Sequence, residues 1–214
     1  MKIKKIAALC KQTKAVILFE RYSRNGNTVS QQYISDGVAA YIVWGLPQLD
    51  TGSVLTIFDV PEKDRDKYVV KTRCIPDGIN FDDADENEKP IEVEMLPIVY
   101  GGKVLKPLQT RSGLVFIDSK YISPVSDVLD VLMLYERSTP GGATYIVAKA
   151  GLLLQAVIIP EDIINQNLVK NLQALTRQCA LSLELRKQKQ ERAKAAEPKQ
   201  CSLIVDPDTG EIVR

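Results

Sequence analysis

Leu18-Phe19-Glu20-Arg21 and Leu134-Tyr135-Glu136-Arg137 are two versions of one short motif, and they lie 116 residues apart in the chain. The same offset aligns three further pairs: Ile6 with Ile122, Gly26 with Gly142, and Thr28 with Thr144. Self-similarity at a fixed offset is typical of a fold built from repeated units. We therefore expect two superposable halves. The alternative is chance similarity between two hairpins, because only a small number of positions are identical at this offset.

A helical pattern precedes each copy of the motif, and a turn follows it. The apolar residues recur at helical spacing: Ile6, Leu9 and Cys10 in the first copy, and Ile122, Val125, Val128, Leu129 and Leu132 in the second. The turns contain glycine and are of the kind that joins antiparallel strands. They are Asn25-Gly26-Asn27 and Pro140-Gly141-Gly142.

Two β-rich stretches, separated at a glycine, follow each turn. They are residues 29–35 and 38–43 in the first copy, and 143–149 and 152–159 in the second. An opening strand, at residues 1–4 or 114–118, completes each unit. The sequence therefore predicts an α+β fold with duplicated β-α-β-β-β units, located near residues 1–45 and 112–160.

Three stretches carry a resemblance to a known family. The second copy opens with Leu-Val-Phe-Ile-Asp-Ser-Lys-Tyr-Ile at residues 114–122 and closes with Leu-Leu-Leu-Gln-Ala-Val-Ile-Ile-Pro at 152–160. The first copy contains Ile34-Ser35-Asp36-Gly37. These stretches resemble the strand that enters a helix, the closing strand and the Ser-Asp-Gly turn of bacterial DNA sliding clamps, the processivity factors of DNA polymerase. The resemblance covers roughly residues 1–160.

The resemblance implies a non-catalytic, DNA-associated protein linked to replication, of the kind that a mobile element encodes. Clamp domains each contain two such units, with helices that line the hole of a ring and strands that form its outer wall. This chain has the length of one clamp domain, so a closed ring would need about six copies. Double-stranded DNA, further copies of the chain and a replication protein are therefore the expected partners.

Charge is segregated along the chain, although 28 basic and 27 acidic residues leave a net charge of only +1. Residues 1–24 carry seven basic side chains and one acidic side chain. A helix that lines a ring should offer cations to phosphate. The expected DNA-binding residues are Lys4, Lys5, Lys11 and Lys14. In the second helical region, Asp127 and Asp130 would repel phosphate.

Composition removes several classes of enzyme. The chain has no histidine, which excludes Ser-His-Asp and Cys-His catalysis and His-ligated zinc. Neither glycine-rich nucleotide-binding motif occurs. The four cysteines are too widely spaced for a zinc or redox motif, so we expect free thiols and a cytoplasmic location. No apolar run reaches about 18 residues, and neither membrane contact nor a cofactor is expected. An enzyme ranks third among the possible functions.

An acidic zone lies between the two copies, with seven acidic side chains in residues 82–94. Asp83, Asp85, Asn87 and Glu94 have the ligand spacing of a calcium loop. However, Glu88 occupies the position where such a loop needs glycine. We therefore favour a solvated acidic loop without a metal, and the role of residues 77–90 stays open.

The segment after Pro160 predicts a helix, because residues 161–197 lack Pro and Gly. Its apolar stripe is Leu168, Leu172, Leu175, Cys179 and Leu183. Residues 186–199 are basic and form either a solvated extension of the helix or a disordered segment, and β-formers on either side of a turn predict a terminal hairpin. The expected domains are 1–160, 161–197 and 198–214.

The stripe suggests a second function of a different class. A self-assembling structural or adaptor protein, with no DNA role, would use Leu168, Leu172, Leu175 and Leu183 as its protein interface. Two heptads are too few for an autonomous coiled coil. We therefore expect the stripe to dock on the chain's own sheet, with added burial from a dimer.

Overall fold

A computed structural model describes residues 2–23, 28–92, 96–196, 204–205 and 212–213, and the chain divides into two units. The first unit is Met1–Asp162 and the second is Ile163–Arg214, so the division lies two residues beyond the predicted boundary at 160. The first unit combines helices with a large mixed sheet, and the second contains one long helix. The predicted α+β class is confirmed.

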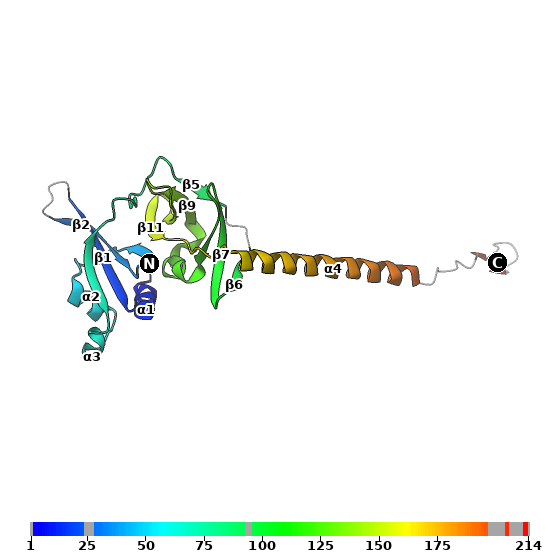
Figure 1. Cartoon of the computed structure of the whole chain (residues 1–214), viewed down its shortest axis with the longest axis horizontal. Coiled ribbons are helices and arrows are strands. Elements are labelled where there is room, and N and C mark those ends of the chain that lie inside the picture. Colours follow the sequence, from blue (N-terminus) through cyan, green and yellow to red (C-terminus); the bar gives the residue numbers. More distant parts are fainter. Residues whose placement is uncertain (1, 24–27, 93–95, 197–203, 206–211, 214) are drawn as a thin grey trace. The chain divides into compact units, whose positions relative to one another are not determined.

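An eight-stranded sheet, in the order β4-β1-β2-β3-β11-β10-β9-β5, forms the body of the first unit (Figure 1). Its strands are β1 (Ala15–Tyr22), β2 (Val29–Ser35), β3 (Ala39–Ile42), β4 (Val69–Cys74), β5 (Lys89–Ile91), β9 (Leu132–Ser138), β10 (Thr144–Ala150) and β11 (Leu153–Ile158). Among the described residues of this sheet, only β1 and β4 are parallel neighbours. A second, three-stranded sheet contains β6 (Ile98–Tyr100), β7 (Lys103–Thr110) and β8 (Gly113–Asp118).

The centre of the large sheet consists of two antiparallel meanders, β1-β2-β3 and β9-β10-β11, joined where β3 pairs with β11. A helical segment precedes each meander in the chain. The registers differ, because Glu20 pairs with Gln32 whereas Glu136 pairs with Ile146. The offset between the copies therefore falls from 116 in the first strands to 114 in the second strands. Beyond the register shift between Arg21 and Tyr22, Thr144 corresponds to Val29, so the predicted alignment of Thr144 with Thr28 is wrong.

The predicted opening strand at residues 1–4 is wrong, because α1 (Ile3–Thr13) begins there. Ile3 belongs to the same helical stripe as Ile6 and Cys10, and the Lys2 carbonyl accepts bonds from the amides of Lys5 and Ile6. Packing that stripe on the sheet favours a helix over a strand. The position beside β1 is taken by β4, from the middle of the chain. The opening strand of the second copy exists as β8, but it pairs with β7.

The second helical segment consists of two 3₁₀ helices, η1 (Ser119–Tyr121) and η2 (Ser123–Val131), rather than an α-helix. Pro124 lies in the first turn of η2, and Val125 and Val128 have non-helical backbone angles. Serine and aspartate side chains, which compete for backbone hydrogen bonds, further weaken α-helical geometry here. The predicted helical residue Leu132 begins β9 instead.

Both faces of the sheet are covered. One face packs against α1, η1 and η2 and against α2 (Thr51–Ile57), which the sequence did not predict. Helix α2 is seven residues long and begins with a capping box, in which the Asp50 carboxylate accepts the amides of Gly52 and Ser53. These bonds from Ser53 and Gly52 lower the pKa of Asp50. A shorter helix, α3 (Glu62–Arg65), follows it.

The opposite face is covered by residues 75–88, which we call the strap. Phe81 of the strap is buried among the sheet residues Tyr33, Tyr145 and Val147. Its ring lies 4.7 Å from that of Tyr33, and the Tyr33 hydroxyl donates to the Phe81 carbonyl. The prediction of a solvated loop is therefore right for most of the carboxylates of the strap, which are exposed. It is wrong for the apolar part of the strap, which forms part of the core.

The second unit contains α4 (Gln166–Ala196) and the short strands β12 (Ile204–Val205) and β13 (Ile212–Val213). Asn165 caps α4 by accepting the Leu168 amide. The predicted helix is confirmed, including its basic extension as far as Ala196. The terminal hairpin is also confirmed, because β12 and β13 are antiparallel, while its turn lies outside the described residues. Within the described residues, no helix is long and apolar enough to cross a membrane.

Candidate nucleic-acid interface

The solvent side of α1 carries two of the four predicted DNA-binding lysines. Lys4 and Lys11 are seven residues apart, so they share one face of the helix, and both are exposed. The opposite side of the helix buries Ile6, Ala7 and Cys10 against the sheet. This amphipathic pattern fixes the direction in which the two ammonium groups point.

The ends of α1 are bonded to the second repeat. At its start, the ammonium groups of Lys2 and Lys5 both donate to the Ser126 hydroxyl, at 2.9 and 3.3 Å, and the Lys2 amide donates to the Pro124 carbonyl at 2.7 Å. At its other end, Lys120 donates to the Gln12 side chain at 3.4 Å. Helix α1 is therefore antiparallel to residues 119–126, and cationic groups lie at both of its ends.

The two remaining predicted lysines differ from Lys4 and Lys11. Lys5 is partly buried, and its bond to Ser126 already uses one of its donors. Lys14 is exposed and ends α1 in the left-handed region, with a φ of 54°. Its carbonyl accepts the Val69 amide at 2.9 Å, which holds this corner in place. We define the α1 face as Lys2, Lys4, Lys11, Lys14 and Lys120.

Sequence reasoning did not place Lys2 and Lys120 in this group. Lys120 stands 116 residues after Lys4, so the repeat offset itself was the available signal. The ammonium group of Lys120 is 3.5 Å from the Asp118 carboxylate and 5.0 Å from the centre of the Tyr121 ring. Asp127 and Asp130 are exposed on η2, as their predicted repulsion of phosphate requires.

A second cluster of charges is buried under the strap. The Arg137 side chain is fully buried and donates to the Glu88 carboxylate and to the carbonyls of Asn80, Asp82 and Asp83. Lys149 donates to the other Glu88 oxygen at 2.6 Å. Burial raises the pKa of Glu88, but the bonds from Lys149 and Arg137 outweigh burial and leave that pKa lowered. This cluster fastens the strap, and its donors have partners within the chain.

The described residues with the spacing of a calcium loop form hydrogen bonds within the chain. Asp83 accepts the Leu154 amide at 2.8 Å, while Asp85 accepts the Asn87 amide and the Asn80 side chain. Glu94 lies outside the described residues. In the described part of the chain, no group of three or more His, Cys, Asp or Glu residues has a geometry suited to a metal ion.

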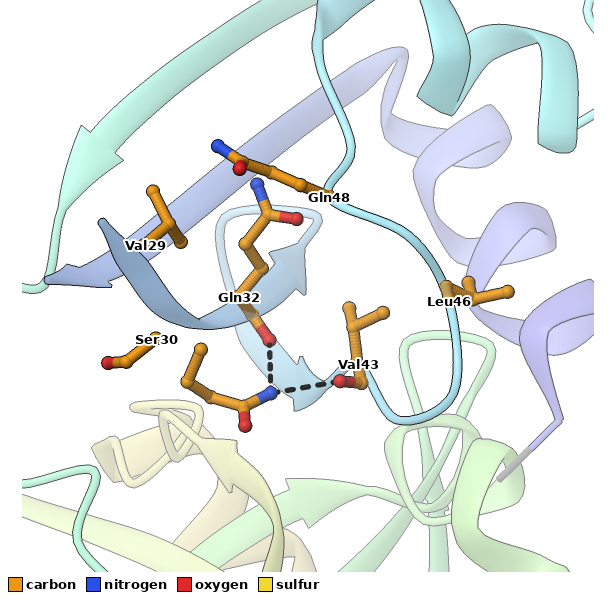
Figure 2. A pocket seen from close by; sticks show the side chains of 7 residues that line it. Val29, Ser30, Gln32, Val43, Leu46 and Gln48 are labelled. Carbon is orange, nitrogen blue, oxygen red and sulfur yellow. Dashed lines mark hydrogen bonds between the residues drawn. The ribbon is translucent and has the colours of Figure 1, made fainter. Parts of the chain in front are cut away.

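A polar hollow of about 150 Å³ lies beside β2 and the loop after β3 (Figure 2). The Gln31 side chain donates to the carbonyls of Gln32 and Val43, as the dashed lines in Figure 2 show. The Gln32 amide bonds to Glu20 and to both backbone groups of Leu49. These amides hold the loop in place, so we do not assign a ligand to this hollow.

The predicted leucine interface is exposed, with the exception of Leu168. Leu172, Leu175 and Leu183 are 38%, 60% and 57% exposed, whereas Leu168 is buried. The docking of the stripe on the chain's own sheet stays a prediction. The expected free thiols are confirmed for Cys10, Cys74 and Cys179. Burial, and secondarily Asp36, raises the pKa of Cys10 to about 12, which makes that thiol a poor nucleophile.

A scan against protein-family models finds no match, and searches of curated proteins and of solved structures find no significantly similar chain. The chain is therefore not assigned to a family.

Proposed function

We propose that this protein is a non-catalytic, clamp-like protein that binds double-stranded DNA through the α1 face. The observation that carries the proposal is the pairing of two meanders across β3 and β11, with α1 bonded side by side to residues 119–126. Two helices set together on one face of a continuous sheet are what a duplicated clamp module requires. The link to replication rests on the resemblance of residues 1–160 alone.

Charge on the α1 face supports the proposal. Its five lysines outnumber Asp118, which lies 3.5 Å from Lys120, and the exposed Asp127 and Asp130, which leaves a cationic excess. Lysine ammonium groups neutralise phosphate without reading bases, so we expect binding that is independent of sequence. The α1 face alone, with about four neutralised phosphates, should make affinity fall roughly a hundredfold between 50 and 200 mM salt.

A salt titration of duplex binding tests the proposal. The variant changes three exposed lysines, Lys4→Glu, Lys11→Glu and Lys14→Glu, and retains Lys5 because of its bond to Ser126. The slope of log affinity against log salt should become shallower by about three, at roughly 0.9 for each phosphate that is no longer neutralised. Binding by the variant that equals binding by the wild type would remove the α1 face as the DNA site.

A matched control separates a local effect from the change in net charge. Lys63→Glu, Lys71→Glu and Arg73→Glu change the charge by the same amount at exposed positions on α3 and β4. This control should retain most of the wild-type slope. Equal losses of affinity in the two variants would mean that net charge, rather than the α1 face, determines binding.

Self-assembly is the second candidate function, favoured by the exposure of Leu172, Leu175 and Leu183. In this alternative, copies associate through α4 and bury these side chains. Replacing Leu172 and Leu175 with Asp should reduce the mass of the native particle to that of one chain. The control variant, Asn171→Asp with Gln178→Asp, adds the same charge outside the stripe. A particle mass unchanged by the leucine variant would eliminate this function.

A further inference from the structure

The second half of α4 carries a concentration of exposed positive charge. Five basic side chains occur in nine residues, and all are exposed: Arg186, Lys187, Lys189, Arg192 and Lys194. The only acidic side chains in this half of the helix are Glu184 and Glu191. We call residues 186–194 the basic half of α4.

The charges of the basic half are sorted around the helix. Glu184 and Glu191 are seven residues apart and therefore share one side. Arg186 and Lys189 are three residues apart and occupy the opposite side, because 3.6 residues complete each turn. Arg192, three residues after Lys189, lies beside that basic side. Lys187 and Lys194 lie three or four residues from Glu184 or Glu191, so they neighbour the carboxylates and extend toward the other edge of the helix. The carboxylates themselves are turned away from Arg186 and Lys189, as a phosphate-binding helix needs.

The basic side continues the leucine stripe. Positions 168, 172, 175, 179, 183 and 186 follow one line along the helix, at spacings of three and four. The stripe therefore changes from apolar to basic within one turn, between Leu183 and Arg186. Between Arg186 and Lys194, no residue is more apolar than Ala193. A helix that inserts into a membrane surface needs large apolar side chains opposite its charges, so this composition favours a nucleic acid over a lipid surface.

We propose that the basic half of α4 binds in the major groove of duplex DNA. The groove is about 12 Å wide, and an α-helix with its side chains is about 10–12 Å across. Arg186 and Lys189 would face the floor of the groove, with Lys187 and Lys194 toward one phosphate strand and Arg192 toward the other. Glu184 and Glu191 would face solvent. The major groove of A-form RNA is too narrow for such a helix.

This site is separate from the α1 face and goes beyond the function proposed above. The test uses the full chain with five changes: Arg186→Gln, Lys187→Gln, Lys189→Gln, Arg192→Gln and Lys194→Gln. Glutamine keeps the helix propensity high, and far-ultraviolet circular dichroism checks that helicity is retained. Because the variant leaves about five phosphates without a cation, the salt slope for duplex DNA should become shallower by about four to five. Lys170→Gln with Arg177→Gln, in the first half of α4, is the control and should change the slope by less than about one.

Three probes distinguish the possible ligands: a 20-base-pair DNA duplex, an RNA duplex of the same sequence, and anionic phosphatidylserine vesicles. Binding should be strongest to DNA, and a major-groove dye such as methyl green should compete with it, whereas the minor-groove ligand netropsin should not. An unchanged slope in the five-residue variant would overturn the proposal. Equal or tighter binding to RNA or vesicles, or competition by netropsin alone, would overturn it as well.

The two DNA sites can fail independently. If the α4 variant binds DNA like the wild type while the α1 variant loses affinity, the groove site is refuted and the α1 face stands. If only the α4 variant loses affinity, the α1 face is refuted and the groove site stands.

Discussion

The Glu-Arg pair occurs at matching places in β1 and β9, yet the two arginines have different surroundings. Arg21 is partly exposed and forms an ion pair with the exposed Asp82 at 2.7 Å. Arg137 is fully buried and bonds to Glu88 and to three backbone carbonyls of the strap. One motif therefore contributes a surface ion pair in the first copy and a buried anchor in the second. The arginine occurs at matching places in both meanders, and only Arg137 of β9 is buried under the strap, where it is structural.

The largest expected effect comes from removing the buried arginine. Arg137→Ala should lower the free energy of unfolding by about 3 to 5 kcal/mol, because it leaves buried carbonyls without donors and removes one partner of a buried pair. Arg21→Ala should cost less than about 1 kcal/mol, since its ion pair is exposed to solvent. Urea unfolding of both variants measures the difference. Similar losses of stability would mean that burial does not distinguish the two copies.

The Glu88 carboxylate should make the stability that the buried Arg137 cluster contributes depend on pH. The pKa of Glu88 is lowered from its ordinary value of 4.5, so the charged form is favoured in the folded state. The contribution of the Glu88 charge to the free energy of unfolding is complete above about pH 4.5. It is lost as the pH falls through the lowered pKa. At pH 7, Glu88→Gln should cost about 3 kcal/mol, because Arg137 and Lys149 remain buried without a counter-charge.

The acid-unfolding curve checks this expectation. Between about pH 5 and pH 3, the stability of Glu88→Gln should fall less steeply than that of the wild type. Glu86→Gln, at an exposed position on the same strap, serves as the control and should leave both the stability and its pH dependence near those of the wild type. Parallel curves for the wild type and Glu88→Gln would show that the cluster does not cause the acid sensitivity.

Elements whose signals lie in neighbouring residues were predicted from the sequence more accurately than elements that depend on other contacts. Strand β2 has its predicted bounds of 29–35, because turn signals flank a β-rich run on both sides. Helix α1 was expected from Ile6, Leu9 and Cys10, but its start was misread because Ile3 alone suits a strand as well as a helix. Helix α2 was missed because it is short, and the Asp50 cap contributes more to its definition than any apolar period.

In the candidate site, too, local features could be predicted from the sequence and long-range contacts could not. Exposure of Lys4 and Lys11 follows from helical periodicity, so sequence could predict it. The bond from Lys5 to Ser126 joins residues 121 positions apart, and the bond from Arg137 to Glu88 joins residues 49 apart. Such pairs depend on how the sheet brings distant segments together, and no local pattern encodes them.

The smallest expected difference between the copies lies in the turns that follow β2 and β10. Gly37 has a φ of 99°, beyond the usual left-handed region, whereas Gly151 has a φ of 60°, within it. An added Cβ would meet no atom within 4 Å at either position, so backbone strain alone sets the cost. Gly37→Ala should therefore lower the free energy of unfolding by about 2 kcal/mol, and Gly151→Ala by about 1 kcal/mol. Urea unfolding of the two alanine variants measures this difference, and m-values equal to that of the wild type would confirm that both retain two-state unfolding. A larger loss of stability at Gly151 would mean that contacts of the second turn, rather than its backbone angle, govern its stability.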